Sequence, residues 1–289
     1  MVIDSTPRSL VFDVFGEYVR ADGGYLTLGA LSRLLGPFDV PPDSLRVLMS
    51  RLRREGLFDT VRSGRHSFYV PSERGWRVLD EGYVRIMGRP LAPWSGEWYV
   101  VIYSVPETER TARVRIRKRL AWLGFAPLAA ATWVSPRDRL DEATAMLEGE
   151  PCVRYDRLVA RSVGPEEDRE RANRAWDLAG LADRYREYLA RWEPEVERVR
   201  ATPPDPEAAF VRRIQVIHEY RKFLFEDPDL PMPLLPPDWP GSRAHEVMLE
   251  NFEVLREPAM RHYREVTAAM PGPPEDRPSP AVPPLPGTL

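Results

Sequence analysis

Apolar residues in the first 90 positions recur at helical intervals three times and then alternate with polar ones. The segments RSLVFDVFGEYVR, LGALSRLLG and SLRVLMSRLRRE each place their apolar residues on one helical face, and Gly36 and Gly56 end the second and third helices. LFDTVRS and HSFYVP alternate and are joined by SGR, which predicts a β-hairpin, and a fourth helix is expected over residues 72–82. This order of three helices, a hairpin and a helix predicts a first domain over residues 1–90.

A different pattern begins after GRPLAPWSGEW, which is typical of a linker. The expected elements are a buried strand at 98–105, an arginine-rich helix at 107–123, short strands at 125–128 and 131–134, a helix at 137–148 and a last strand at 152–162. This βαββαβ order predicts a ferredoxin-like middle domain over residues 91–165, with both helices on one face of an antiparallel sheet.

The rest of the chain is predicted to be helical. Helices over 172–199, 205–225 and 242–269 form an all-α C-terminal domain, residues 166–270, and a proline-rich loop lies between the last two. The final segment, residues 271–289, has eight prolines in nineteen residues and is predicted to be disordered, because it has few apolar side chains to bury. The predicted fold class is therefore α+β, with three domains and a tail.

Composition points to a cytoplasmic protein without catalytic machinery. No apolar run approaches the roughly 20 residues that cross a bilayer, and no signal peptide precedes the first helix, so we expect no membrane partner. The single cysteine, Cys152, excludes an internal disulfide and fits a reducing compartment. The four histidines are widely spaced and no phosphate-loop, zinc-protease or hydrolase motif occurs, so no metal, cofactor or enzymatic activity is expected.

The arginines of the third helix, residues 43–55, form a local basic surface in a chain whose net charge is −3. At about 100° per residue, Arg46, Ser50 and Arg53 lie together beside the apolar stripe of that helix. Arg62 and Arg65 lie at the predicted hairpin tip. Arginine can hold guanine in the major groove or clamp a phosphate. Helix, hairpin and arginines together predict a winged helix-turn-helix whose third helix enters the major groove.

Three long stretches resemble the PaaX family of bacterial repressors. They are LRVLMSRLRREGLF with RSGRHSFYVPSERG, then WSGEWYVVIYSVPETER with RKRLAWLGFAPLAAATWVSP, and VIHEYRKFLFEDPDLPMPLLPPDWPGSRA. One stretch falls in each predicted domain, and the resemblance covers about residues 7–265, so that the proline-rich tail lies outside it.

The resemblance implies a homodimeric transcriptional repressor that binds double-stranded operator DNA and controls phenylacetic acid degradation. It also implies release by an acyl-CoA such as phenylacetyl-CoA. Carried onto this chain, the recognition helix is residues 43–55 and the wing is residues 62–67. The expected DNA contacts are Asp43, Ser44, Arg46, Ser50, Arg51, Arg53, Arg54, Arg62 and Arg65.

Two groups of residues are candidates for effector contacts. Arg113 and Arg117 lie on one face of the arginine-rich helix and could pair with the phosphates of coenzyme A or with additional DNA backbone. Trp94 and Trp98, near the linker, could enclose the acyl group. In both cases a structural role, as a solvated helix face or as core packing, stays open as the alternative.

Two other functions are compatible with the predicted architecture. The middle domain resembles a small CRISPR adaptation nuclease in topology, but that nuclease needs an acidic metal ligand at the end of its first strand, where this chain has YSVP. A winged-helix protein could also serve in interactions that involve no sequence-specific DNA binding. The salt dependence of duplex binding separates that alternative from the repressor hypothesis.

Overall fold

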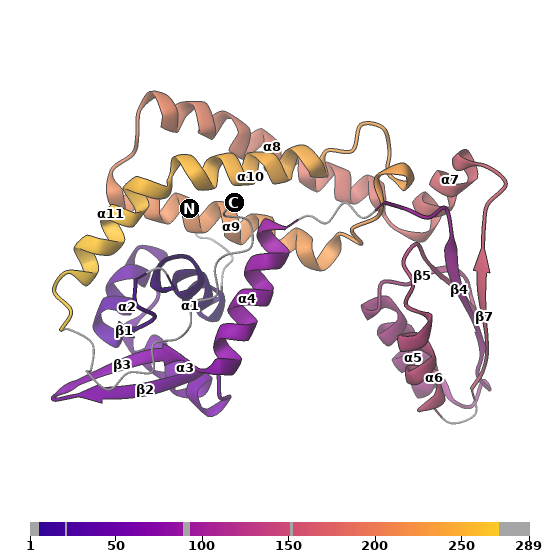
Figure 1. Cartoon of the computed structure of the whole chain (residues 1–289), viewed down its shortest axis with the longest axis horizontal. Coiled ribbons are helices and arrows are strands. Elements are labelled where there is room, and N and C mark those ends of the chain that lie inside the picture. The colour runs from indigo at the N-terminus through magenta and orange to yellow at the C-terminus, as the bar shows by residue number, and fades with distance from the viewer. Residues whose placement is uncertain (1–5, 21, 89–92, 151–152, 272–289) are drawn as a thin grey trace. The chain divides into compact units, whose positions relative to one another are not determined.

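The computed structural model describes residues 6–20, 22–88, 93–150 and 153–271, and they fall into two compact units. The first unit takes its residues from 1–89, 187–224 and 243–289, and the second from 90–186 and 225–242. Cys152 and the predicted tail beyond residue 271 lie outside the described residues. Helices and two antiparallel sheets make up the described chain (Figure 1), which confirms the mixed fold class. None of the described helices is long and apolar enough to cross a bilayer.

Three helices open the first unit, close to their predicted positions. Thr6 and Thr27 begin the first and second helices, because their side-chain oxygens accept hydrogen bonds from backbone N–H groups three residues later. The third helix buries Leu45, Met49 and Leu52 along its predicted stripe. The elements are α1 (Pro7–Val14), the π-helical segment η1 (Phe15–Val19), β1 (Leu26–Thr27), α2 (Leu28–Leu35), the 3-10 helix η2 (Gly36–Phe38) and α3 (Pro42–Arg54).

The predicted hairpin follows α3 and is completed by the short strand β1, in the order β1-β3-β2. Its strands are β2 (Phe58–Ser63) and β3 (His66–Pro71), and the next helix is α4 (Glu73–Met87). Gly64 has a φ of 56°. A positive φ is required there because Gly64 is the first position of a two-residue turn between the paired residues Ser63 and His66. Ser72 caps α4 by accepting a hydrogen bond from the N–H of Gly75. α4 is longer than the predicted 72–82, because Gly82 lies inside the helix and does not end it.

C-terminal helices pack against α1 and η1 in the same unit. The aromatic ring of Tyr18 lies 4.9 Å from that of Phe210 and 5.4 Å from that of Tyr263. Arg221 forms an ion pair of 2.6 Å with the buried Asp13. Parts of the predicted first and third domains therefore share one core. These contacts come from α9 (Pro206–Glu226) and α11 (Arg256–Thr267), and the other helices of this part of the chain are α8 (Leu178–Ala201) and α10 (Gly241–Val254).

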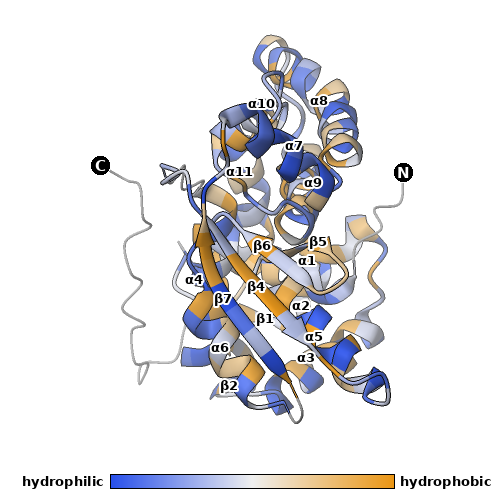
Figure 2. Ribbon diagram, turned by 90° about the vertical axis from the view of Figure 1, so that its right-hand side faces the viewer, coloured by the Kyte–Doolittle hydropathy of each residue, from blue (hydrophilic) through white to orange (hydrophobic). Residues whose placement is uncertain are grey.

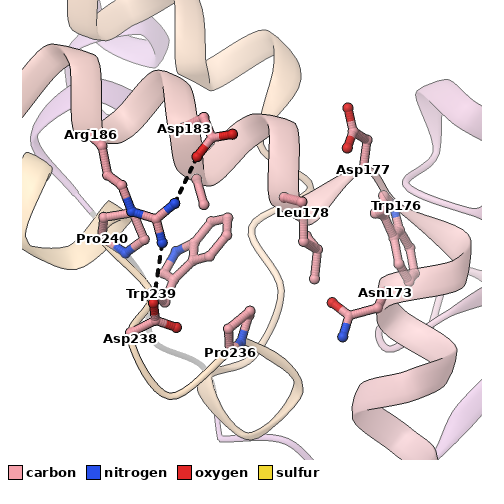
Figure 3. Close-up of a pocket in the computed structure, with 12 residues that line it drawn as sticks. Asn173, Trp176, Asp177, Leu178, Asp183, Arg186, Pro236, Asp238, Trp239 and Pro240 are labelled. Carbon is pink, nitrogen blue, oxygen red and sulfur yellow. Dashed lines mark hydrogen bonds and ion pairs between the residues drawn. The ribbon is translucent and has the colours of Figure 1, made fainter.

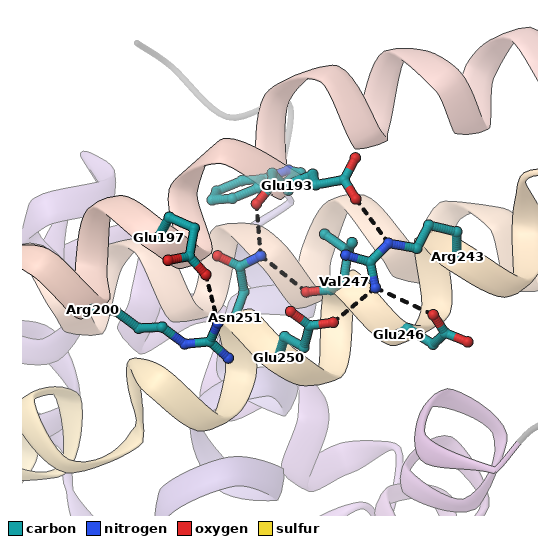
Figure 4. A network of polar contacts seen from close by, with 9 residues as sticks. Glu193, Glu197, Arg200, Arg243, Glu246, Val247, Glu250 and Asn251 are labelled. Atoms are coloured by element: carbon teal, nitrogen blue, oxygen red, sulfur yellow. Dashed lines mark hydrogen bonds and ion pairs between the residues drawn. The ribbon is translucent and has the colours of Figure 1, made fainter.

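A polar network joins α8 to α10 within this unit (Figure 4). Arg243 lies 2.8 Å from Glu193 on α8, and it also pairs with Glu246 and Glu250 one and two turns along its own helix. The fully buried Asn251 donates hydrogen bonds to the carbonyl oxygens of Trp192 and Val247. Because buried amides are costly unless they are hydrogen-bonded, Asn251 fixes how these two helices pack.

The second unit contains a four-stranded antiparallel sheet in the order β5-β6-β4-β7. Figure 2 colours β4 as hydrophobic along most of its length and β7 as mixed, which fits the central position of β4 and the edge position of β7. Val101 and Tyr103 of β4 pack with Ile116 and Leu147 in the core beneath the helices. The elements are β4 (Trp98–Ser104), α5 (Arg110–Trp122), β5 (Ala126–Ala129), β6 (Thr132–Ser135), α6 (Leu140–Glu148), β7 (Arg154–Ala160), α7 (Pro165–Ala175) and η3 (Met232–Leu234).

Two predicted long helices are each broken in the structure. The segment 172–199 is divided because Trp176 is extended, and Asp177 then accepts a hydrogen bond from the N–H of Gly180 and begins α8. The segment 242–269 is divided at Leu255, which separates α10 from α11. Pro258 lies in the first turn of α11. Proline has no N–H and is tolerated in the first turn of a helix but not in its interior, so a helix start precedes Pro258.

Candidate nucleic-acid interface and ligand cleft

The face of α3 opposite its buried stripe is exposed and rich in arginine. Arg46 is 69% exposed and lies 3.5 Å from Asp43, one turn earlier. Arg53 and Arg54 are also exposed, and neither side chain has a hydrogen bond or ion pair with another residue in the described part of the chain. Ser44 and Ser50 of the same helix are exposed as well. The predicted DNA contacts on α3 therefore share one accessible surface.

Arg51 differs from the other arginines of α3, because Glu55 holds it. The Arg51 Nε lies 2.9 Å from Glu55, and Arg8 of α1 lies 2.7 Å from the other oxygen of the same carboxylate. The hydrogen bonds from Arg8 and Arg51 hold the pKa of Glu55 below its usual value. The charge of Arg51 is thus balanced within the protein, which makes it the weakest of the predicted phosphate contacts on α3.

The hairpin carries its two arginines outward at and beside its turn. Arg62 is exposed on β2 opposite Ser67 on β3, and Arg65 is exposed in the turn. The Nε of Arg65 lies 3.3 Å from His66, so the guanidinium is only weakly held. Gly64, at the first central position of the turn, matches the type II′ geometry that suits a twisted hairpin.

A rigid frame connects α3 to the hairpin and to α4. The rings of Phe12 and Phe15 pack edge-on against Phe58 at the start of β2, at 5.9 Å and 4.8 Å. The carbonyl oxygens at the end of α3 accept further hydrogen bonds, from Arg74 and from the hydroxyl of Ser72. These contacts hold the arginine face and the hairpin in one fixed arrangement, as a surface that reads a groove requires.

A cleft of about 990 Å³ lies at the C-terminal end of β4, in the second unit. Arg113 and Arg117 of α5 both line it, and Arg154 of β7 adds a third cation that the sequence interpretation missed. Its apolar lining includes Ile102, Val105, Leu128 and Trp133. The lining also includes one acidic residue, Asp156. With three guanidinium groups against one carboxylate, the cleft keeps a net positive charge, and together with its apolar walls this suits a ligand that combines anionic and apolar parts.

Two buried polar groups in the wall of this cleft have no partner within the described structure. They are the hydroxyl of Tyr103 and the indole N–H of Trp133, in side chains that are 4% and 3% exposed. Buried polar groups are normally hydrogen-bonded, so these two groups are exceptions within the described residues. Their positions on paired strands could have been found from strand alternation, because Tyr103 shares a face with Val101, the partner of Trp133.

The other arginines of α5 have a structural role. Arg115 pairs with Glu150 through two hydrogen bonds, one of them 2.7 Å long, and Arg119 lies 3.7 Å from the same carboxylate. These contacts, that of Arg115 above all, lower the pKa of the buried Glu150. Arg113 and Arg117 are left to face the cleft, with Arg113 lying 3.3 Å from the carbonyl oxygen of Val105.

Trp94 and Trp98 are not brought together with these arginines. Trp98 is 1% exposed, its N–H donates to Asp168 at 2.7 Å, and its ring packs between Trp94 and Trp176. It lies three residues before Val101 and so points away from the core that Val101 and Tyr103 share. Neither tryptophan lines the arginine cleft, and the burial and packing of Trp98 favour the alternative of core packing for that residue.

A second, smaller cavity of about 380 Å³ lies among α7, the start of α8 and the proline-rich segment (Figure 3). Trp176 and Trp239 contribute aromatic walls. Arg186 crosses its rim and pairs with Asp183 at 2.8 Å and Asp238 at 3.2 Å. Trp239 belongs to the proline-rich segment and is only 7% exposed. In the described residues, no group of three acidic, histidine or cysteine side chains is arranged to hold a metal.

Comparisons with known proteins assign all three parts of the chain to one family. Residues 6–75 match the family described as PaaX-like protein, residues 91–172 the PaaX protein central Cas2-like domain, and residues 176–265 the PaaX-like protein C-terminal domain. The chain belongs to the PaaX family, as its resemblance predicts. Members of this family are transcriptional regulators and not enzymes.

Two relatives match nearly the whole chain. The transcriptional repressor PaaX of Escherichia coli strain K12 is 26% identical over 263 residues, which are 89% of this chain and 83% of the relative. The solved structure of the uncharacterized protein Rv0674 from Mycobacterium tuberculosis is similar with a TM-score of 0.61 and 26% identity, over 91% of this chain and 99% of that one.

Proposed function

We propose that this protein is a transcriptional repressor that binds double-stranded operator DNA through α3 and the β2–β3 hairpin. The observation that carries the proposal is the exposed face of α3, from which Arg46, Arg53 and Arg54 project on a helix fixed by its buried side. In this interpretation residues 1–90 are a winged helix-turn-helix, with α3 in the major groove and the hairpin on the phosphates. The description of the E. coli relative as a transcriptional repressor supports repression as the outcome. Such a repressor acts in the cytoplasm, where the bacterial chromosome lies.

The residue types on α3 suit base recognition. The guanidinium groups of Arg46, Arg53 and Arg54 can donate paired hydrogen bonds to guanine O6 and N7. Asp43 is exposed at the start of the helix and can accept from the amino group of cytosine, and the hydroxyl of Ser50 can bond to either base type. Arg62 and Arg65 of the wing supply charge for phosphates without reading sequence.

Two substitutions separate base reading from phosphate binding. Arg53→Ala is expected to cost about 1–3 kcal/mol on the operator and much less on random DNA. Arg65→Ala is expected to weaken binding to both alike and to reduce the salt slope of the binding constant by about 1. Titrations of labelled duplexes over a range of salt concentrations measure both effects.

Arg200→Ala serves as the matched control, because Arg200 is a half-exposed arginine of α8 paired with Glu197 and should leave both affinities unchanged. Equal losses on operator and random DNA for Arg53→Ala would show that α3 does not read bases. Binding of duplex DNA that does not depend on salt, or no binding at all, would favour the alternative of a winged-helix interaction protein.

The second part of the proposal is that an acyl-CoA, such as phenylacetyl-CoA, relieves repression by binding the cleft at the end of β4. In this interpretation the second unit contains the ferredoxin-like middle domain. The cations of Arg113, Arg117 and Arg154 suit the phosphates of coenzyme A, and the apolar wall suits the acyl group.

The experiment for this part compares three ligands on the operator-bound protein. Phenylacetyl-CoA is expected to weaken operator binding by up to about 150-fold, the upper range of allosteric coupling, whereas phenylacetate and free coenzyme A are not. Phenylacetate lacks the phosphates and coenzyme A lacks the apolar group. An operator affinity that no acyl-CoA changes would exclude this effector class.

The proposed active form is a homodimer. Two copies of α3 would then read half-sites about 34 Å apart, or a multiple of that spacing, on an operator with matching two-fold symmetry. Light scattering of the intact protein with and without operator DNA tests the stoichiometry. A single monomer bound per operator would contradict the proposal.

A further inference from the structure

Val47 is an exposed apolar side chain at the centre of the arginine face of α3. It is 69% exposed, compared with 49% for Val84 and 40% for Val78 in the same unit. At about 100° per residue, it lies about 140–160° around the helix from each of the buried residues Leu45, Met49 and Leu52. It therefore points straight away from the core of the protein.

The fold gives no reason for a valine at this position. A β-branched side chain loses rotamer freedom in a helix, and at this exposure Val47 recovers little of that loss through burial. Other valines are exposed too, among them Val84 on α4 and Val114 on α5, so exposure alone does not assign a role. What distinguishes Val47 is its surroundings.

The neighbours of Val47 on the helix surface are residues one or two turns away along the same face. Asp43 precedes it by four residues, Ser50 and Arg51 follow it by three and four, and Arg54 follows by seven. All four are among the residues proposed to face DNA. An isopropyl group is thus held at the middle of a surface whose other members recognise polar atoms and charge.

The major groove offers one apolar group to such a side chain, which is the C5-methyl group of thymine. We propose that Val47 packs against a thymine methyl and specifies a T·A pair at one position of each operator half-site. This inference rests on the proposed DNA binding by α3 and adds a specificity residue to it. The arginines around Val47 supply the charge complementarity that brings the duplex to this face.

Replacement of thymine by deoxyuridine tests the contact, because it removes the methyl group and leaves the pairing and the hydrogen-bonding atoms unchanged. The probe is the shortest genomic duplex that the intact protein protects, with one thymine at a time replaced in one half-site. Wild-type protein is expected to bind the duplex about fourfold more weakly when the thymine at one particular position is replaced. This is the effect of losing one buried methyl group.

Val47→Ala is expected to bind the unmodified operator about fourfold or more weakly and to be insensitive to deoxyuridine at that position. Val114→Ala, an exposed valine of α5, is the control and should keep the full sensitivity of the wild type. Because Val47 is exposed, both variants should fold, which circular dichroism verifies.

The inference is overturned if wild type and Val47→Ala show the same loss at every thymine, or if no thymine methyl matters to the wild type. These results would leave operator binding by α3 intact. Failure of the intact protein to protect any genomic duplex would instead overturn the proposed DNA binding and this inference with it.

Discussion

The carboxyl group of Glu17 makes stability depend on pH in a way that the structure predicts. Its side chain is 10% exposed in η1 and lies 3.6 Å from the guanidinium of Arg213 on α9. Burial raises the pKa of Glu17 from 4.5 to about 7. The charges of Arg213 and Arg20 oppose this increase, and the negative charge of Asp13 adds to it. Glu17 lies in the core shared by α1 and the C-terminal helices, so its titration reports on that core.

The sign follows from the raised pKa. A carboxyl group that binds its proton more tightly in the folded state favours folding at low pH. Its contribution is fully present below pH 4.5 and is lost as the pH rises through about 7. The difference between these two pKa values corresponds to about 3 kcal/mol, of which about 2 kcal/mol falls between about pH 5 and about pH 7.5.

The perturbation is Glu17→Gln, which keeps the shape of the side chain and removes the titration. The free energy of unfolding in urea, measured at about pH 5 and about pH 7.5, should fall by about 2 kcal/mol more in the wild type than in the variant. The matched control is Glu253→Gln, because Glu253 is 66% exposed and pairs with Arg256 on the surface. It should keep the pH dependence of the wild type.

An unchanged pH dependence in Glu17→Gln would refute the reasoning. A midpoint near 4.5 for Glu17, measured by the carboxyl carbon shift in nuclear magnetic resonance, would refute it as well. Either result would mean that the contact between η1 and α9 is more open to water than the structure indicates.

Two further predictions concern α4 and the ligand cleft. A Cβ on Gly75 would lie 2.1 Å from the carbonyl oxygen of Leu57, so Gly75→Ala should lower the free energy of unfolding by about 1–3 kcal/mol or more. Gly82→Ala in the same helix meets nothing within 4 Å and should raise it by about 0.5–1 kcal/mol; equal effects of both changes in urea unfolding would refute the packing at Gly75. The double variant Arg113→Ala, Arg117→Ala should keep wild-type operator affinity but lose its response to phenylacetyl-CoA in a competition titration, with Lys118→Ala as control. A wild-type response from the double variant would move the effector site away from this cleft.

Local patterns were sufficient to predict the exposed arginine surface of α3. The apolar stripe of α3 and the cap and turn residues around it are set within a few positions of one another, so the predicted helix 43–55 agrees with Pro42–Arg54. Gly64 at the hairpin turn is a similarly local signal. The assignment of Arg113 and Arg117 to one surface also follows from helical spacing alone.

Features that depend on distant residues were not predictable in the same way. The charge of Arg51 is balanced by Glu55, which is itself held by Arg8, 47 residues away. Trp133 borders the cleft because it pairs with Val101 on another strand. The sequence pointed to Trp98 instead, because Trp98 lies near the linker. Strand alternation could have separated Trp98 from Tyr103, but it could not have placed Arg154 beside them.

The most direct test of the central claim is the ratio of two affinities of the intact protein, for its genomic site and for random duplex of the same length. The site is first recovered by footprinting on genomic DNA, and both dissociation constants are then measured at one fixed salt concentration. Sequence reading by α3 predicts a ratio of about a thousandfold or more. A ratio near one, with wild-type and Arg53→Ala protein behaving alike, would contradict the claim that this protein is a sequence-specific repressor.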